Sequence, residues 1–182
     1  MLKFAFIFEA GSPVGDNHQT VYENAESYNL LKGIDSVDNA EAVVKKLVDE
    51  EGYELLNFCG AFTEEMLDSY RKAVNKDVRM AVVKYLPEED AKFEKLSAVE
   101  EYGIIVVMRG VTEMTKVELK GGSLNAYAYF VKDLDMAKEA AKKLVADGIH
   151  FIELCSWFDR EKTDAIIQAI DGKVPVGTAG TL

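Results

Sequence analysis

The segment NAEAVVKKLVDEEGYELLNFCGAFTEEMLDSYRKAVNKDV (39–78) decides the fold, because it recurs as MAKEAAKKLVADGIHFIELCSWFDREKTDAIIQAIDGKV (136–174). One deletion opposite Glu51 keeps the two segments in register, and about a third of the aligned positions are then identical. The matched pairs include Gly52 with Gly148, Cys59 with Cys155, and Phe62 with Phe158. Two amphipathic helices share charged and apolar positions by chance, but they do not also share a cysteine, a glycine and a phenylalanine at fixed offsets. We therefore predict an internal duplication.

Both copies predict the same order of elements. In the first half we expect strands at 3–9, 28–34, 53–59 and 78–84, with helices at 38–51 and 64–74. In the second half we expect strands at 103–109, 124–131, 149–155 and 174–178, with helices at 134–147 and 160–170. Strands that alternate with helices favour parallel pairing through right-handed crossovers. The predicted class is α/β, with two tandem β-β-α-β-α-β repeats of mostly parallel strands packed about a pseudo-two-fold axis. The sequence does not decide between one closed barrel and two open sheets.

A proline-led acidic segment, LPEEDAKFEKLSAVEEYG (86–103), separates the halves. Proline and acidic residues favour the first turn of a helix, so we expect a connecting helix at 86–102. The first repeat then spans 1–85 and the second spans 103–182, and we expect them to pack as one globular unit because no low-complexity linker lies between them. The first strands align less well, as FAFIFEAG (4–11) with GIIVVMRG (103–110). Residues 10–27 predict a long loop, whereas Gly121-Gly122 predicts a hairpin in the second half.

The 182 residues include 21 Lys and Arg against 32 Asp and Glu, a formal net charge of −11. Nucleic acid and anionic membranes both attract clustered basic residues, so this balance argues against either partner. No apolar run approaches the roughly 20 residues that cross a bilayer. Two cysteines suit a reducing cytoplasm, and two histidines do not make a zinc-type cluster, so we expect no metal and no cofactor. We expect a soluble cytoplasmic protein, either a monomer with pseudo-dimeric halves or a homodimer.

Candidate site residues gather at the exits of the third strands, NFCGAFTEE (57–65) and ELCSWFDRE (153–161). Alternation places Asn57 on one face with Cys59, and Glu153 on one face with Cys155. Burying an amide or carboxylate without a partner is costly, and the carboxyl edges of parallel sheets are where α/β folds bind ligands. Glu153 is a general-base candidate if burial raises its pKa. The two cysteines are either small buried hydrophobes or thiols activated by a helix terminus.

Other candidates lie outside the strands. Gly60 and Ala61 form a small turn before Thr63, a predicted helix N-cap, where backbone N–H groups can hold an anion. His18 lies in the long loop, which we expect to act as a lid, and Glu9 ends the first strand. The predicted catalytic candidates are Cys59, Glu153, Cys155 and His18, and the predicted ligand-binding residues are Glu9, His18, Asn57, Gly60, Ala61 and Thr63.

The two exits also predict an asymmetry between the halves. Gly60-Ala61 leaves room for a ligand, whereas Ser156-Trp157 crowds the matched turn. We therefore expect an open pocket beside Cys59 and a closed surround at Cys155, with Trp157 mostly buried. Replacing a buried aromatic residue of this size by alanine costs about 3–5 kcal/mol.

FIFEAGSPVGDNH (6–18), followed by a strand, a helix and the strand exit CGAF (59–62), resembles a family of short prokaryotic α/β proteins known only as a domain of unknown function. The resemblance implies one such unit in each relative, with a histidine after the first strand, matched here by His18. It also implies a Glu-Leu-Cys strand exit, matched by Glu153-Leu154-Cys155. The chain departs from that pattern at Asn57, which replaces the glutamate, and at Ser156-Trp157, which replaces a glycine pair. The resemblance implies no established activity.

Two functions therefore remain in competition. The first is binding or conversion of a small polar metabolite at the carboxyl edge of the sheet. The alternative is a non-catalytic structural or protein-interaction module in which the matched cysteines only pack. The sequence does not decide whether the protein is an enzyme.

Overall fold

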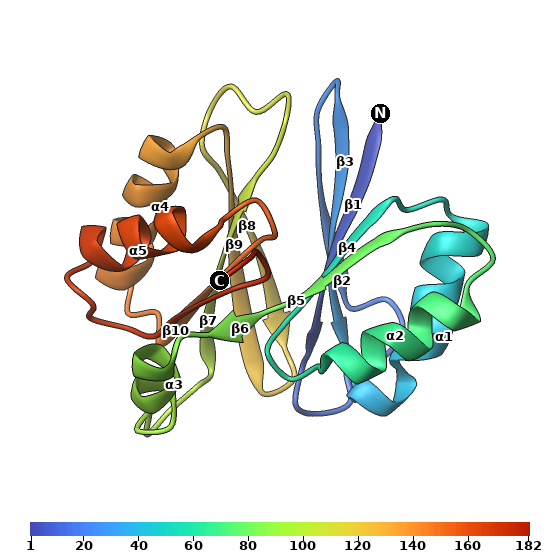
Figure 1. Ribbon diagram of the computed structural model, residues 1–182, viewed down its shortest axis with the longest axis horizontal. Coiled ribbons are helices and arrows are strands. Elements are labelled where there is room, and N and C mark those ends of the chain that lie inside the picture. The colour runs from blue at the N-terminus through green and yellow to red at the C-terminus, as the bar shows by residue number, and fades with distance from the viewer.

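The computed structural model describes residues 1–182 and consists of two open β-sheets flanked by helices (Figure 1). The first sheet has the strand order β2-β3-β1-β4-β5. Its strands are β1 (Leu2–Glu9), β2 (Gln19–Glu23), β3 (Ser27–Ile34), β4 (Leu55–Phe58) and β5 (Arg79–Val82). Its helices are α1 (Ala40–Lys45), which follows a 3₁₀ turn (Val37–Asn39) and continues as a π-helix (Lys46–Glu50), and α2 (Glu64–Ala73). All strand pairs are parallel except β2 with β3.

The second sheet has the order β6-β11-β10-β7-β9-β8. Its strands are β6 (Lys84–Tyr85), β7 (Glu101–Val107), β8 (Thr115–Gly121), β9 (Leu124–Val131), β10 (Phe151–Leu154) and β11 (Val176–Thr178). Its helices are α3 (Pro87–Phe93), α4 (Leu134–Ala146) and α5 (Arg160–Ala169). The edge strands β6 and β8 are antiparallel to their neighbours, and the inner strands are parallel. None of the helices combines the length and the apolar character that crossing a membrane requires.

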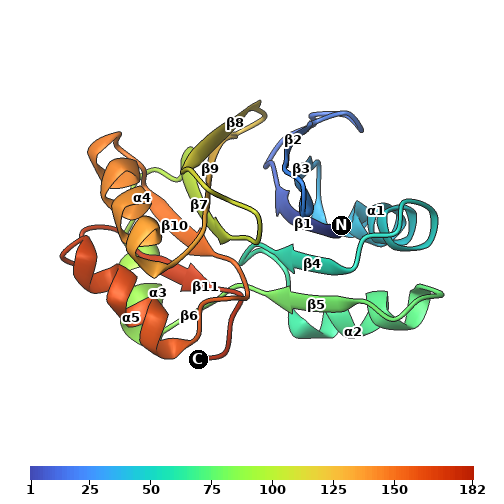
Figure 2. The same ribbon diagram turned by 90° about the horizontal axis from the view of Figure 1, so that it is seen from above.

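The two sheets face each other, and the helices cover their outer faces, α1 and α2 on one side and α4 and α5 on the other (Figures 1 and 2). Aromatic rings fill the space between the sheets. Tyr22 of β2 stacks on Phe130 of β9 with ring centroids 4.7 Å apart, and Phe8 of β1 meets Tyr102 of β7 edge-on at 5.7 Å. A single connected core of 51 buried hydrophobic residues spans both halves. The hydrophobic effect therefore holds the halves together as well as each half separately.

Hairpin tips fix the halves relative to each other. The backbone N–H of Ser123, in the β8–β9 turn, donates to the carbonyl of Ala10 just after β1, at 2.8 Å. In the opposite direction, the β2–β3 turn reaches the segment after β7. Asn24 Nδ2 and Ser27 Oγ donate to the carbonyl of Arg109 at 3.1 and 3.3 Å. Each hairpin tip thus binds the exit of the other half's first strand.

The predicted α/β class is confirmed, as two open sheets and not as a closed barrel. Three local expectations need correction. The segment 10–27 contains strand β2, so both halves carry a hairpin. The strand expected at 78–84 divides at Val83, because β5 pairs with β4 in the first sheet whereas β6 pairs with β11 in the second. The connecting helix α3 ends at Phe93, short of the expected residue 102.

Sheet register also corrects the alignment of the first strands. Phe6 pairs with Asn57 of β4, and Ile104 pairs with Glu153 of β10. Because Asn57 and Glu153 are counterparts in the repeat, Phe6 corresponds to Ile104, one residue from the expected Ile105. The counterpart of Tyr102 is accordingly Phe4, which carries no hydroxyl group.

Candidate functional site

Asn57 of β4 and Glu153 of β10 are buried polar residues, and each reaches across to the other half. The backbone N–H of Ser156 donates to Asn57 Oδ1 at 2.8 Å, and Asn57 Nδ2 donates to Ser156 Oγ at 3.1 Å. The backbone N–H of Gly60 donates to Glu153 Oε1 at 3.0 Å. Gly60 and Ser156 begin the matched turns, so these contacts correspond to each other. Each half therefore supplies hydrogen-bond partners for the polar side chain that the other half buries.

The Glu153 carboxylate is 3% exposed and accepts two further hydrogen bonds. Tyr85 OH donates to Oε1 at 2.9 Å, and Tyr102 OH donates to Oε2. Burial raises the pKa of Glu153, and the hydrogen bonds from Tyr102, Gly60 and Tyr85 act in the opposite direction. Burial, followed by the Glu153 charge, also raises the pKa of both phenols well above the ordinary value. Tyr85 and Tyr102 therefore keep their protons and remain donors.

Glu153 forms part of the wall of a cavity of about 370 Å³ between the halves. The cavity joins the carboxyl edge of the first sheet to β7, β10 and α3 of the second half. Its lining comprises the aromatic residues Tyr85, Phe93, Tyr102 and Phe151, the acidic residues Glu9, Asp90 and Glu153, the small residues Gly11, Cys59, Gly60 and Ala61, and Val99, Ser123 and Leu124. No lysine, arginine or histidine is among them. A mainly apolar wall with a few polar groups is typical of small-molecule sites.

Both cysteines are buried and unpaired with each other. Burial raises the pKa of the Cys155 thiol to about 11. Burial and then the Glu153 charge raise the pKa of the Cys59 thiol, while backbone N–H groups of Glu9 and Ala61 partly oppose this. The thiol is the stable form of both at neutral pH, and the thiol is a poor nucleophile. Their environment favours the packing interpretation.

The cavity brings together five of the predicted site residues, Glu9, Cys59, Gly60, Ala61 and Glu153. Three others lie elsewhere. Asn57 is bonded to Ser156, and Cys155 lines a different hollow. Thr63 is the N-cap of α2, where Oγ1 accepts the backbone N–H of Met66 at 3.3 Å.

His18 does not cover the cavity as the predicted lid. Its ring lies between the halves, edge-on to Phe8 with ring centroids 6.3 Å apart and against the Cα atoms of Gly33 and Gly121, where a side chain would meet it. Its Nε2 is buried without a hydrogen-bond partner. Burial and then the charge of Lys32 lower the pKa of His18, and Asp35 acts in the opposite direction. The neutral ring therefore packs as part of the interface.

The Trp157 side chain does not fill the space at the exit of β10. Trp157 is 40% exposed, which contradicts the expected burial, and a hollow of about 480 Å³ lies beside Cys155. The indole meets the Phe158 ring edge-on at 5.1 Å, and the Lys162 ammonium lies 4.8 Å from its centroid. A ring held in this way lies at the surface and leaves the space beside Cys155 empty of protein. The prediction of one open and one closed exit is wrong, because both exits are hollowed and the second hollow is the larger.

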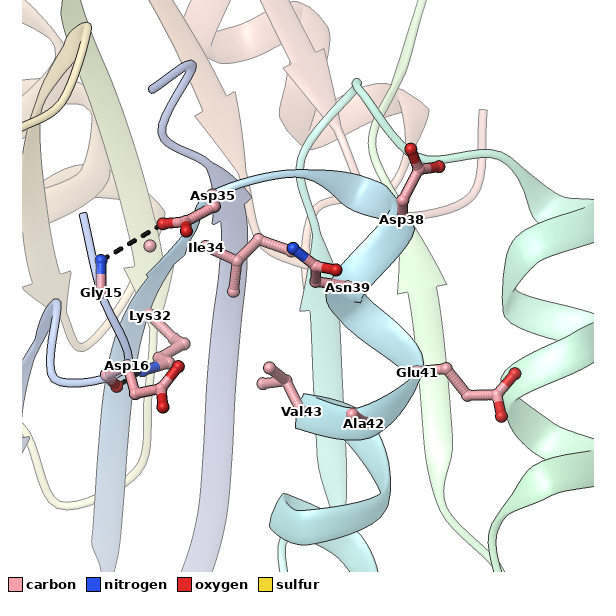
Figure 3. Close-up of a pocket in the computed structure, with 11 residues that line it drawn as sticks. Gly15, Asp16, Lys32, Ile34, Asp35, Asp38, Asn39, Glu41, Ala42 and Val43 are labelled. Carbon is pink, nitrogen blue, oxygen red and sulfur yellow. Dashed lines mark hydrogen bonds between the residues drawn. The ribbon is translucent and has the colours of Figure 1, made fainter. Parts of the chain in front are cut away.

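A third hollow, of about 620 Å³, lies between the end of β3 and α1 (Figure 3). Asp35 Oδ1 accepts the backbone N–H groups of Val14 and Gly15 at 2.7 and 3.2 Å, which holds the loop after β1 at its edge. Lys32 is 6% exposed, and its ammonium donates to the carbonyl of Asp16 and to Gln19 Oε1. These groups satisfy one another, so we do not take this hollow as the site. No group of three or more His, Cys, Asp or Glu side chains is placed to hold a metal ion.

Sequence reasoning missed the two phenols and the rings of Phe93 and Phe151. One signal pointed toward donors of this kind, since a buried glutamate on an apolar strand requires hydrogen-bond partners. The sequence does not say which tyrosines supply them, because Tyr85 and Tyr102 reach Glu153 only through the packing of strands β6, β7 and β10.

Comparison with known proteins identifies the chain at the level of a family. One solved structure, a crystal structure of an NtrC family transcriptional regulator from Clostridium acetobutylicum, matches over the whole of this chain and 88% of that chain, at 13% identity and a TM-score of 0.30. That likeness is too weak to carry an argument. No curated protein matches the chain. The model of a family of unknown function, DUF6506, matches twice, over residues 2–98 and 100–181. The chain therefore belongs to this family of unknown function and contains two copies of its unit.

Proposed function

We propose that the protein binds a small molecule in the cavity beside Glu153. The observation that carries this proposal is a buried carboxylate, held by two phenols and the Gly60 N–H, in the wall of a cavity lined by four aromatic rings. A packing role alone needs no empty space of about 370 Å³ next to such a group.

The charge of the lining indicates the class of ligand. Glu9, Asp90 and Glu153 supply negative charge, and no basic side chain opposes it. An organic anion would be repelled, whereas a protonated amine or a neutral hydrogen-bond donor would be attracted. The aromatic walls favour an apolar body. The ligand is therefore a small amine or alcohol with an aromatic or aliphatic body, rather than an acidic metabolite.

The same geometry supports proton transfer. Burial raises the pKa of the Glu153 carboxyl group, which favours its protonated form, so the group is suited both to accept and to donate a proton. Tyr102 and Tyr85 hold the carboxylate in place and stabilise its charged form. Cys59 contributes space and polarity and does not act as a nucleophile in this proposal.

Thermal-shift measurements with phenylpropylamine, phenylpropanol and phenylpropionate test the proposal, because these probes share a body and differ in charge. We expect stabilisation by the amine, less by the alcohol, and loss of the amine effect in Glu153→Gln and Ala61→Leu, which remove the charge and fill the cavity. Glu118→Gln is the matched control, since Glu118 is an exposed acid paired with Lys116 and Lys120. Stabilisation that survives both cavity substitutions would refute the site.

The second candidate function is a structural or interaction module. The paired contacts of Asn57 with Ser156 and of Glu153 with Gly60 favour it, because they join the halves whatever the cavity holds. These pairs also support the proposed pseudo-two-fold relation of the halves. Superposing the two repeats in a crystal structure tests that relation, and halves that fail to superpose over the helix–strand–helix core would exclude it.

A further inference from the structure

The hollow beside Cys155 has a lining unlike that of the first cavity. Apolar side chains of both halves form its walls, among them Leu2, Phe4, Val107 and Met108. The polar part consists of Ser156 and two arginines, Arg79 at the start of β5 and Arg109 after β7. Neither aspartate nor glutamate lines it.

The two arginines are unusual in this acidic chain because neither has a carboxylate partner. The other two arginines are both paired, Arg71 with Asp68 at 2.7 Å and Arg160 with Asp164 at 3.0 Å. The guanidinium groups of Arg79 and Arg109 form neither an ion pair nor a hydrogen bond, and both residues are exposed. The protein has a net charge of −11, so two unpaired guanidinium groups beside one hollow create a local patch of positive charge.

We propose that this hollow is a second binding site, for a small organic anion with an apolar body. A guanidinium group matches a carboxylate through two parallel N–H donors, so Arg79 and Arg109 would hold the acid group. The apolar walls would take the body of the ligand, and Trp157 would flank it with its exposed ring. This site is separate from the cavity beside Glu153, which selects the opposite charge.

Trp157 is the only tryptophan of the chain, so its fluorescence reports on this hollow. We expect phenylpropionate to change the Trp157 emission in a saturable way, with phenylpropanol at least 10-fold weaker and phenylpropylamine without effect. Added salt should weaken the binding, because exposed charges are screened.

The variant Arg79→Gln/Arg109→Gln should lower the affinity for phenylpropionate at least 10-fold. Both side chains are exposed, so we expect the fold to persist, and circular dichroism checks this. Arg160→Gln is the matched control, because it removes an arginine charge from the same half as Arg109 and should leave the affinity within about twofold. Glu153→Gln should also leave it unchanged, which separates this site from the first. Equal binding to the double variant and the wild type, or equal binding of the amine, would overturn the proposal.

Discussion

The exits of β4 and β10 occupy matched places in the repeat but have opposite chemistry. At the first exit, Gly60 donates to a carboxylate, and the adjoining cavity is acidic. At the second, Ser156 donates to an amide, and the adjoining hollow carries two unpaired arginines. The backbone hydrogen bond that joins the halves is the same in both places. The duplication has therefore kept the scaffold contact while the charge around it has changed.

Two substitutions between the copies account for much of this difference. Glu153 is replaced by Asn57, which needs no charge compensation and is satisfied by Ser156 alone. Tyr102 is replaced by Phe4, which removes the hydroxyl that would otherwise bond to a carboxylate. Glutamate and tyrosine occur together in one copy and are absent together from the other. The pair behaves as a unit, as expected when one group satisfies the other.

Removing the two buried acceptors should give the largest difference between the exits. Glu153→Ala leaves the Tyr85 and Tyr102 hydroxyls and the Gly60 N–H without an acceptor, and should lower the free energy of unfolding by about 2–4 kcal/mol. Asn57→Ala leaves only the Ser156 groups unpaired and should cost about 1–3 kcal/mol. Urea denaturation measures both. A larger cost for Asn57→Ala would show that the first exit does not hold the stronger network.

The thiols of Cys59 and Cys155 should be protected from alkylation to different degrees. With the pKa of Cys155 raised from 9.0 to about 11, its thiolate fraction near pH 8 falls about 100-fold, and alkylation by iodoacetamide should slow at least as much relative to the unfolded chain. Cys59 should react more slowly still, because the Glu153 charge adds to its burial. The variants Cys59→Ala and Cys155→Ala allow each rate to be measured alone. Rapid alkylation of Cys59 in the folded protein would restore the activated-thiol hypothesis.

The raised pKa of Glu153 should make the contribution of Glu153 to the free energy of unfolding depend on pH, whereas the contribution of its counterpart Asn57 should not. A group whose folded pKa lies above its unfolded value, here 4.5, binds more protons in the folded state, so its contribution to stability grows as pH falls through the folded pKa toward 4.5. Relative to Glu153→Gln, the wild type should therefore gain stability between neutral pH and pH near 4.5. Asn57→Ala, which removes no titrating group, should show the wild-type pH dependence. Parallel pH profiles of wild type and Glu153→Gln would contradict the assignment.

The repeat made most of the fold predictable, because helix and strand periods, helix-ending glycines and N-caps are local signals. The strand β2 was not predictable in this way. It is a short edge strand, and its pairing with β3 depends on Asn24, whose Oδ1 accepts the backbone N–H groups of Glu26 and Ser27 at 2.8 and 2.9 Å. Such a side-chain turn gives no apolar periodicity.

The candidate site was predictable only in part, for a reason of geometry. Cys59, Gly60 and Ala61 follow one strand, so their proximity is a property of the sequence. Glu153 joins them because the sheets face each other, and Tyr85 joins because the chain crosses to the second sheet after Val83. Contacts between halves depend on how two surfaces dock, which residue patterns within one half do not encode.

The smallest change in the free energy of unfolding is expected for Trp157→Ala. This variant tests whether the Trp157 ring fills the space beside Cys155. A ring that is 40% exposed, with Lys162 above it and Phe158 at its edge, contributes mainly an exposed cation–π contact and partial packing. Trp157→Ala should therefore lower the free energy of unfolding by only about 0.5–1.5 kcal/mol. Phe158→Ala removes a fully buried neighbour and should cost about 3–5 kcal/mol in the same urea titration. If the two costs were equal, the indole would have to occupy the hollow beside Cys155 in solution, and the space assigned to an anionic ligand would not exist.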